Sequence, residues 1–333
     1  MNERRVVVAF DKFRGSATAI ELVDAVSAAV SEAGWEVSGA PLADGGEGSL
    51  DVLGGANKSS LVTGPLGDPI EAKWRLDGRT AFVEMASASG LNLVGGADGN
   101  DPMAADTYGT GELISRAIEM GARTVYVMLG GSATSDGGFG AIRALPPASR
   151  LKEIDLVVAC DVATRFTDAA KVFGPQKGAS SAQIQLLTRR LERLVQMYQD
   201  DYGVDISEMD GAGAAGGLAG GLVAVGARVE SGFDVLAEEA ELDRLLRGAR
   251  LVITGEGYLD DETFNGKVVG GVANWAATED VPVLAIVGAR DKSVEIPSHV
   301  EVVALSERFG EEASWSRTVA LAAEVAVGAL ADR

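Results

Sequence analysis

Five apolar, strand-like runs in this chain each end in a polar stretch containing glycine or an acid, and this repetition constrains the fold more than any other feature. The stretches are "AFDKFRGS", "PLADGGEGS", "MLGGSATSDGG", "VACDV" and "VITGEGYLD". A helical pattern follows the first of them, with Ile20, Val23, Val26 and Val30 at helical spacing. Alternating strands and helices predict a parallel sheet covered by helices.

The pattern changes near residue 60. Residues 60–90 contain short alternating runs broken by Gly, Pro and Asp, which is typical of antiparallel strands. Strands and helices alternate again from about residue 249. We therefore expect an α/β protein with two domains. Residues 1–60 and 249–333 would form a discontinuous Rossmann-like domain with a parallel sheet. Residues 61–248 would form an inserted α/β domain with a mixed or antiparallel sheet.

Glycine is unusually frequent, with 43 residues in a chain of 333. The glycines cluster in short runs, which suggests tight turns or backbone that lies close to a ligand. One tract, "GAGAAGGLAGGLVAVGA" at residues 211–227, is low in complexity but apolar. It predicts a helix of small residues packed closely against a neighbour rather than a flexible linker.

Composition excludes several classes of partner. The formal charge of −20 and the lack of a Lys/Arg block argue against nucleic acid. No apolar run approaches the roughly 18 residues needed to span a membrane. The first residues, "MNERRVVVAFDKF", do not resemble a signal peptide, so we expect a cytoplasmic protein. Cys160 is the single cysteine and is expected to be a small buried hydrophobe. His299 is the single histidine, which disfavours a histidine-based triad or general base.

Acidic residues recur at or just past the ends of the predicted strands. They are Asp11, Asp44, Asp136, Asp161, Glu256 and Asp260. One such acid is ordinary turn chemistry, but ligands of open α/β sheets bind beyond the carboxyl ends of the strands. Carboxylates gathered at one edge repel each other and need a metal or cationic partners. Lys12, Lys177 and Lys267 could supply positive charge, and Lys267 precedes a predicted helix that could help to hold phosphate.

Most short sequence motifs of known binding sites are absent from this chain or out of place in it. The match of "GAGAAG" to a dinucleotide-binding loop follows a polar segment instead of a buried strand, and no Walker A pattern or zinc-ligand spacing is present. Phosphoryl transfer fits better, because it requires mainly positioning, charge neutralisation, Mg²⁺-binding carboxylates and an acid to take the acceptor proton.

Several motifs together resemble the bacterial glycerate kinase family. In order they are "FDKFRGSATA", "PLADGGEGS", "VEMASASGL", "TYGTGELI", "LGGSATSDGG", "VACDV", "VFGPQKGA", "GAGAAGGL" and "LVITGEGYLD" followed by "NGKVVGGVA". The resemblance implies phosphorylation of D-glycerate by ATP with Mg²⁺, commonly at the 2-hydroxyl. It also implies two α/β domains with the site in the cleft between them.

Roles can be suggested for the residues in these motifs. Asp11, Lys12 and Ser16 would face the glycerate or the transferred phosphoryl group. Gly130, Gly131 and Ser132 would form an anion-binding nest for phosphate or carboxylate. The catalytic candidates are Asp11, Lys12, Asp44, Asp136 and Glu256. The substrate-binding candidates are Ser16, Gly45, Gly46, Glu47, Gly130, Gly131, Ser132, Asp161, Lys177 and Lys267. The metal-binding candidates are Asp44, Glu256 and Asp260.

The chain also departs from the family pattern. Ser135 stands where members usually carry Asn, and Glu262 where they carry Gln. The segments at 143–156 and 162–172 are shorter than usual, and the second lacks the usual Asn-Pro-Leu run and Gly-Ala pair. These departures leave two alternatives open. One is a kinase of another small sugar acid, and the other is a catalytically inactive metabolite-binding homologue.

Overall fold

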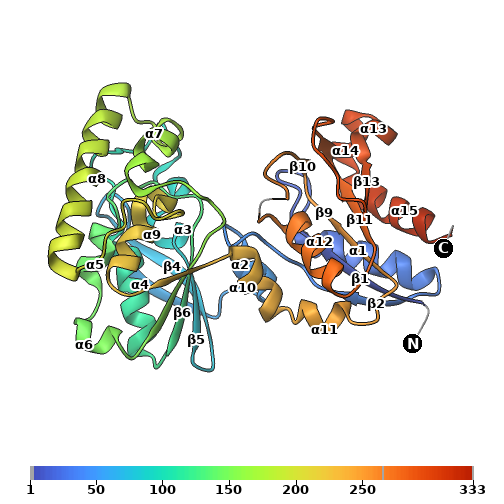
Figure 1. Cartoon of the computed structure of the whole chain (residues 1–333), viewed down its shortest axis with the longest axis horizontal. Helices are drawn as coiled ribbons and strands as arrows, with labels where there is room; N and C mark the ends of the chain where they lie inside the picture. Colours follow the sequence, from blue (N-terminus) through green and yellow to red (C-terminus); the bar gives the residue numbers. More distant parts are fainter. Residues whose placement is uncertain (1–3, 265, 332–333) are drawn as a thin grey trace. The chain divides into compact units, whose positions relative to one another are not determined.

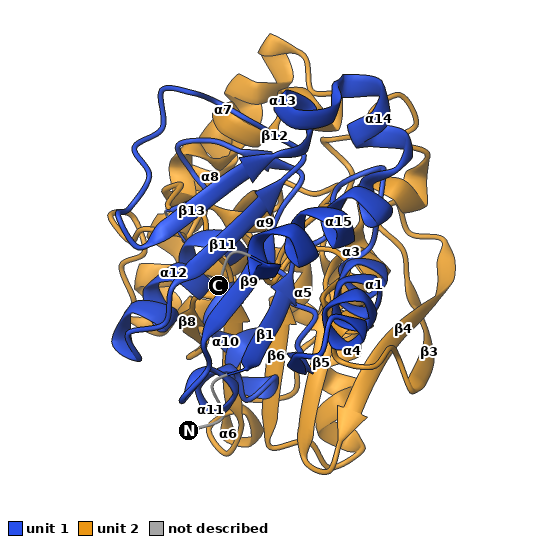
Figure 2. Cartoon of the chain, turned by 90° about the vertical axis from the view of Figure 1, so that its right-hand side faces the viewer, with its two compact units in different colours: residues 1–44, 232–333 blue, residues 45–231 orange. Residues whose placement is uncertain are grey.

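The chain forms two compact units, each with its own sheet. The structure is a computed structural model that describes residues 4–264 and 266–331. Unit 1 comprises residues 1–44 and 232–333, and unit 2 comprises residues 45–231. Figure 2 shows unit 1 in blue and unit 2 in orange. Both units are α/β, as the sequence predicts.

Unit 1 contains a five-stranded parallel sheet. Its strands are β1 (Arg5–Phe10), β2 (Glu36–Gly39), β9 (Leu251–Gly255), β11 (Val283–Val287) and β13 (Val300–Ala304). The spatial order is β13-β11-β9-β1-β2, and every pairing is parallel. The order shows that the N-terminal and C-terminal parts of the chain build one sheet, which confirms the predicted discontinuous parallel sheet.

Helices cover both faces of this sheet (Figure 1). Val6 and Val8 pack with α1 (Ala19–Glu32) and α15 (Thr318–Ala331), whereas Val7 packs on the opposite face. The side chains alternate because successive residues of a strand point to opposite faces. The opposite face is covered by α10 (Gly232–Glu239), α11 (Leu242–Leu246) and α12 (Val268–Thr278). The short elements of unit 1 are β10 (Tyr258–Leu259), β12 (Ala289–Arg290), α13 (Leu305–Phe309) and α14 (Glu311–Ser316).

Unit 2 contains a six-stranded mixed sheet in the order β3-β4-β5-β6-β7-β8. The strands are β3 (Lys58–Thr63), β4 (Pro69–Asp77), β5 (Thr80–Glu84), β6 (Thr124–Met128), β7 (Asp155–Ala159) and β8 (Arg228–Glu230). Strands β3, β4 and β5 pair antiparallel, and the remaining pairings are parallel. The antiparallel strands predicted between residues 60 and 90 are therefore present.

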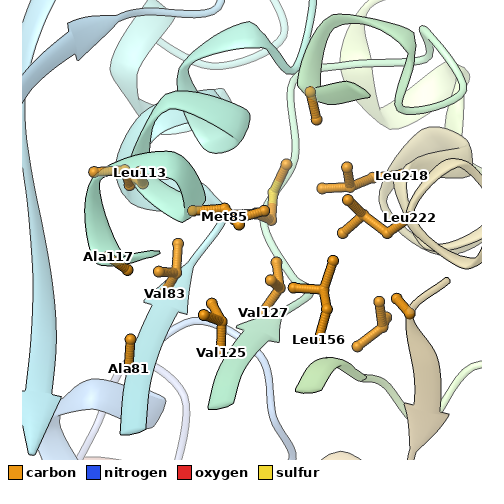
Figure 3. Packing of buried hydrophobic residues seen from close by; sticks show 14 of the residues in the cluster. Ala81, Val83, Met85, Leu113, Ala117, Val125, Val127, Leu156, Leu218 and Leu222 are labelled. Atoms are coloured by element: carbon orange, nitrogen blue, oxygen red, sulfur yellow. The ribbon is translucent and has the colours of Figure 1, made fainter. Parts of the chain in front are cut away.

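The core of unit 2 lies between this sheet and its helices (Figure 3). Val83 of the sheet lies on the side of Leu113, and Val127 lies on the side of Leu218 and Leu222. The longer helices are α4 (Tyr108–Glu119), α8 (Ser181–Tyr202) and α9 (Ala214–Ala224). The short ones are α2 (Ser49–Val52), α3 (Ala86–Ser89), α5 (Phe139–Ala144), α6 (Ala148–Leu151) and α7 (Ala169–Phe173). Three 3₁₀ turns span Leu91–Val94, Phe166–Asp168 and Pro175–Lys177.

The Gly/Ala tract forms the close-packed helix that the sequence predicts, with one added feature. Ala215, Gly216 and Gly217 have positive φ, so a left-handed turn precedes the regular part of α9. A Cβ at Gly216 would lie 1.9 Å from the carbonyl oxygen of Thr134. Gly216 is therefore required both by its φ and by the proximity of the residue 134 backbone.

The boundaries between the units differ from those expected. The sequence placed them after residues 60 and 248, whereas the chain changes unit after Asp44 and after Ser231. Residues 48–50 belong to unit 2 because the N–H groups of Gly48 and Leu50 donate to the carboxylate of Glu84. Helices α10 and α11 belong to unit 1 because they pack against α12. Within the described residues, none of the helices combines the length and the apolar character needed to cross a bilayer.

Candidate active site

A cavity of about 550 Å³ lies in unit 1 at the carboxyl ends of the parallel strands. Asp11 follows β1 directly, and Glu256 follows β9 directly. From β1 the chain continues to β2 on one side and resumes at β9 on the other, so the order of strands reverses between β1 and β9. Such a switch point is where open α/β sheets bind their ligands. The cavity therefore lies at the site that the fold favours.

The cavity brings together seven of the predicted site residues. They are Asp11, Lys12, Ser16, Asp44, Glu256, Asp260 and Lys267. Arg14 also lines the cavity. With Glu311 included, five carboxylates and three cationic side chains surround this one space.

Asp11 is a buried carboxylate at the start of this cavity. Its Oδ1 accepts a hydrogen bond of 2.7 Å from the Lys12 N–H, and its own N–H donates to the carbonyl of Gly255 at 3.0 Å. Burial raises the pKa of Asp11 to about 6, and the nearby charge of Asp44 adds to the rise while Lys12 opposes it. Asp11 therefore exchanges a proton near neutral pH.

Glu256 lies beside Asp11 on the neighbouring strand and is similarly perturbed. Burial raises the pKa of Glu256 to about 7, although a hydrogen bond from Thr263 and the charge of Lys267 act in the opposite direction. The Thr263 hydroxyl donates to Glu256 Oε1 at 2.6 Å and accepts from the Asp260 N–H at 3.0 Å. This chain of hydrogen bonds fixes the Glu256 carboxylate, since the Thr263 hydroxyl can point its hydrogen only at Glu256.

Lys267 supplies positive charge from the residue that precedes α12. Its Nζ lies 3.1 Å from Asp260 Oδ1 and 3.3 Å from Glu262 Oε2. Burial alone would lower the pKa of Lys267, but the hydrogen bonds to Asp260 and Glu262 raise it, so the side chain is charged. Glu262 thus gives Lys267 a second anionic partner.

The acidic residues of the cavity are suitable ligands for a magnesium ion. Mg²⁺ is usually held by one or two carboxylates together with phosphate oxygens and water. Glu256 and Asp44 line the same cavity, and the negative charge of Asp11 adds to the rise in the pKa of Glu256. A divalent cation would relieve this repulsion. Among residues 4–264 and 266–331, no three His, Cys, Asp or Glu side chains are grouped so that they could hold a metal by themselves.

A second group of predicted residues lies in unit 2, around the loop that follows β6. A Cβ at Gly130 would lie 2.9 Å from Gly46 Cα and 3.0 Å from the Glu47 nitrogen. Gly131 has a φ of +62°, and the side chain of Glu47 lies close to it. The two glycine-rich stretches that the sequence singled out therefore pack backbone against backbone.

Lys177 is buried beneath this loop. Its Nζ donates to Ser132 Oγ at 2.8 Å and to the carbonyl oxygen of Thr134 at 2.6 Å. Burial lowers the pKa of Lys177 to about 7, and the negative charge of Asp136 opposes this effect. Because the Ser132 oxygen accepts from Lys177, the Ser132 hydrogen can point toward another acceptor. Lys177 thus shapes the loop and orients Ser132, and with a side chain that is only 1% exposed it does not itself face solvent.

Asp136 holds the same loop in place by accepting hydrogen bonds. Its Oδ2 accepts from the Thr107 N–H at 3.0 Å, from the Thr107 hydroxyl at 2.8 Å and from the Gly140 N–H at 3.0 Å. Its Oδ1 accepts from the Gly138 N–H at 3.2 Å. Four protein donors occupy a carboxylate with about four acceptor sites. This arrangement favours a positioning role for Asp136 over proton transfer.

Two other predicted residues lie apart from these groups. Asp161 follows β7 and is half-buried next to Cys160, a buried thiol whose pKa is raised to about 11 by burial. His299 is a structural residue, as expected, because its Nε2 lies 3.2 Å from the carbonyl oxygen of Ala273 in α12. The stretch "PLADGGEGS" is itself divided, since Asp44 belongs to unit 1 and Gly45, Gly46 and Glu47 to unit 2.

The structure adds residues that the sequence pattern missed. Thr263 fixes Glu256, and Glu84 binds the backbone of residues 48–50. Glu84 carries the same signal as the other acids, because it ends strand β5. Tyr258 and Trp315 line the unit 1 cavity. Trp315 lies in the C-terminal part of the chain, outside the strand ends, so no local signal indicates it.

Unit 1 gathers acids and lysines at the carboxyl ends of its parallel strands, and unit 2 has a glycine-rich loop over a buried lysine. Each feature suits an α/β protein that binds anionic ligands. A sequence model of the glycerate kinase family matches residues 6–147 and 146–327. This chain belongs to the glycerate kinase family, whose members are phosphotransferases with an alcohol group as acceptor.

Individual relatives agree with this assignment. The chain is 36% identical to glycerate 2-kinase of Escherichia coli K12, over 88% of this chain and 87% of that protein. It is 37% identical to glycerate kinase of Bacillus subtilis 168, over 86% of this chain and 85% of that protein. The crystal structure of a protein described as putative glycerate kinase 2 from Salmonella typhimurium LT2 is similar with a TM-score of 0.81 and 32% identity, over 99% of both chains.

Proposed function

We propose that this chain transfers the γ-phosphoryl group of ATP to the 2-hydroxyl of D-glycerate with Mg²⁺. The observation that carries the proposal is the unit 1 cavity, where Asp11 and Glu256 flank the switch point of the sheet beside Lys267. The relatives, a glycerate 2-kinase and a glycerate kinase, support the choice of acceptor.

The lysines and the acids of the cavity would have different roles. Lys267 and Lys12 would neutralise the phosphates of the donor, since phosphoryl transfer depends mainly on positioning and electrostatic stabilisation. Glu256, locked by Thr263, and Asp44 would hold Mg²⁺, with Asp260 acting through its ion pair to Lys267. When bound, Mg²⁺ would offset the negative charge of the donor phosphates.

Asp11 would accept the proton of the acceptor hydroxyl. A general base works best when its pKa lies near the operating pH, and burial places the pKa of Asp11 at about 6. Ser16 lines the same cavity and its hydroxyl donates to the Phe13 carbonyl at 3.3 Å, so its oxygen can accept a further hydrogen bond.

The unit 2 loop would bind an anionic group, either a phosphate or a carboxylate. Gly130 and Gly131 offer backbone N–H groups, and Ser132 offers the hydroxyl hydrogen that Lys177 leaves available. Gly45, Gly46 and Glu47 would support this loop by packing against it, and Asp161 is a further candidate contact.

Product identification tests the proposal. The protein would be incubated with ATP, Mg²⁺ and D-glycerate, and the product examined by phosphorus NMR. A 2-phosphoglycerate signal that requires both Mg²⁺ and glycerate is the expected result. No phosphorylated product with any small hydroxy acid would refute it.

A second candidate is a kinase of another small sugar acid. The segment at 162–172, which the sequence is expected to make shorter than in other members of the family, favours it, and the apolar side chains of Val162 and Val172 are exposed there. A panel of hydroxy acids with three to six carbons separates the two activities. A homologue that only binds metabolites would instead show thermal stabilisation by the ligands without release of ADP.

A further inference from the structure

Two large aromatic side chains stand exposed at the unit 1 cavity. Trp315 is 64% exposed and Tyr258 is 53% exposed, and both line the same space as Asp11, Glu256 and Lys267. The cavity therefore combines a charged region with an aromatic wall. Its volume of about 550 Å³ falls within the range of about 300–1,000 Å³ that is usual for small-molecule sites.

The position of Trp315 is set by contact with a glycine. Gly15 has a φ of +82°, and a Cβ built on it would lie 3.1 Å from both Cη2 and Cζ2 of the indole. The ring edge thus rests on the Gly15 backbone, while most of the side chain faces open space. Gly15 belongs to the loop that carries Asp11 and Lys12, so the indole and the charged groups share one support.

The exposed aromatic side chains suit a ligand with a planar face, which glycerate lacks. A three-carbon hydroxy acid has no planar surface to cover an indole, whereas every nucleobase has a π-face that stacks on aromatic side chains. Polar groups for the edges of a base or for a ribose stand nearby, because Gly288, Ser306 and Ser314 also line the cavity. The Ser314 hydroxyl donates to the carbonyl of Glu311 at 2.8 Å, which leaves its oxygen as an acceptor.

We propose that Trp315 is the stacking platform for the nucleobase of the phosphoryl donor, and that the unit 1 cavity is accordingly the nucleotide site. The base would lie on the indole, and the phosphates would extend toward Lys267 and the acidic residues. This inference rests on the proposed function in that it takes the donor to be a nucleoside triphosphate.

Direct binding of two ligands tests the assignment. Affinities for MgADP and for magnesium tripolyphosphate, which has phosphates but no base, would be measured by titration calorimetry. Trp315→Ala should weaken MgADP about tenfold or more, since stacking on one aromatic side chain commonly contributes this much. It should leave tripolyphosphate affinity within about twofold, and Trp315→Phe should retain most of the MgADP affinity.

Fluorescence gives a second readout. MgADP should quench the tryptophan emission of the parent protein and of Trp35→Phe, whose indole packs at α1 away from the cavity, but not that of Trp315→Phe. An equal loss of affinity for both ligands in Trp315→Ala, or no loss for either, would overturn the proposal.

These measurements require no turnover. A protein that binds MgADP through Trp315 but does not phosphorylate glycerate would refute the proposed function and leave the stacking site standing. A protein that phosphorylates glycerate with an unchanged KM for ATP in Trp315→Ala would refute the stacking site alone.

Discussion

At the scale of single residues, Glu256 shows how a residue of the candidate site can destabilise the folded protein. Its side chain is buried beside Asp11, and only Thr263 and Lys267 favour its charged form. The folded protein therefore holds a proton on Glu256 up to a pH of about 7, whereas the unfolded chain releases it near its ordinary value of 4.5. Between these two pH values the folded state binds more protons, so stability falls as pH rises.

Glu256→Gln should therefore stabilise the protein at pH 8 and have little effect at pH 4. The gain at pH 8 should be on the order of 2–3 kcal/mol, because the amide has no charge to desolvate and its oxygen still accepts from Thr263. Activity should fall about 100-fold or more, since the amide is a much weaker ligand for a cation. Denaturant unfolding at the two pH values and a coupled ADP assay measure both effects. Equal stabilisation at both pH values would contradict the explanation.

Lys177 changes the stability with pH in the opposite direction to Glu256. Burial lowers its pKa from 10.5 to about 7, so between these values the unfolded chain binds more protons and stability rises with pH. Below pH 7 both states are protonated and the full cost of burying the charge is present.

Lys177→Met should remove the rise in stability that the buried lysine causes above pH 7. The free energy of unfolding of the variant, measured by urea titration from pH 7 to 10, should increase less with pH than that of the parent protein. The variant should also lose affinity for the anionic group that the loop binds, because the Ser132 hydroxyl is no longer oriented. Identical pH slopes in the two proteins would rule out a buried ammonium at this position.

At the scale of elements, the glycine loops show what sequence patterns can and cannot reveal. The pattern indicated that the loops after β6 and around residue 45 require glycine, and the structure gives the reason in the contact of Gly130 with Gly46. The pattern did not reveal that Asp136 is bound by four donors, because its partner Thr107 comes from a segment 29 residues away. Strand ends are encoded locally, but hydrogen-bond partners are chosen by the tertiary fold.

Gly130→Ala should destabilise the protein by about 1–3 kcal/mol, because the added methyl group would meet backbone atoms of Gly46 and Glu47 that cannot move aside easily. Gly328→Ala is the matched control. Nothing lies within 4 Å of a Cβ at Gly328 in helix α15, so alanine there should stabilise by roughly 0.5–1 kcal/mol. Thermal unfolding compares the two. A neutral Gly130→Ala would show that the loops are not in contact.

At the scale of the whole molecule, the sequence was sufficient for the architecture of two α/β units and insufficient for their boundaries. The change from helical to alternating patterns near residue 60 is real, but it marks the start of an antiparallel hairpin within unit 2. The chain enters unit 2 after Asp44, and Glu84 of this unit binds the backbone of residues 48–50 across 34 to 36 positions of sequence. Contacts of that kind have no local signature.

The boundary can be tested with two fragments of the chain. Residues 45–231 contain two complete apolar clusters and every strand of the mixed sheet, so this fragment should fold alone and unfold cooperatively. Residues 61–248 are the matched comparison. This fragment lacks the donors to Glu84 and half of β3, and it carries α10 and α11 without the α12 surface that covers them. Loss of the partners of one buried carboxylate alone should cost about 1–3 kcal/mol.

Circular dichroism at increasing temperature should therefore show a lower and broader transition for residues 61–248 than for residues 45–231. The same ranking should appear in limited proteolysis, because α10 and α11 would be cleaved first when their apolar faces have no cover. Equal melting temperatures for the two fragments would mean that residues 45–60 contribute nothing to unit 2. In that case the hydrogen bonds to Glu84 would be too weak to make residues 45–60 part of unit 2. The boundary of unit 2 would then lie at the start of the antiparallel strands.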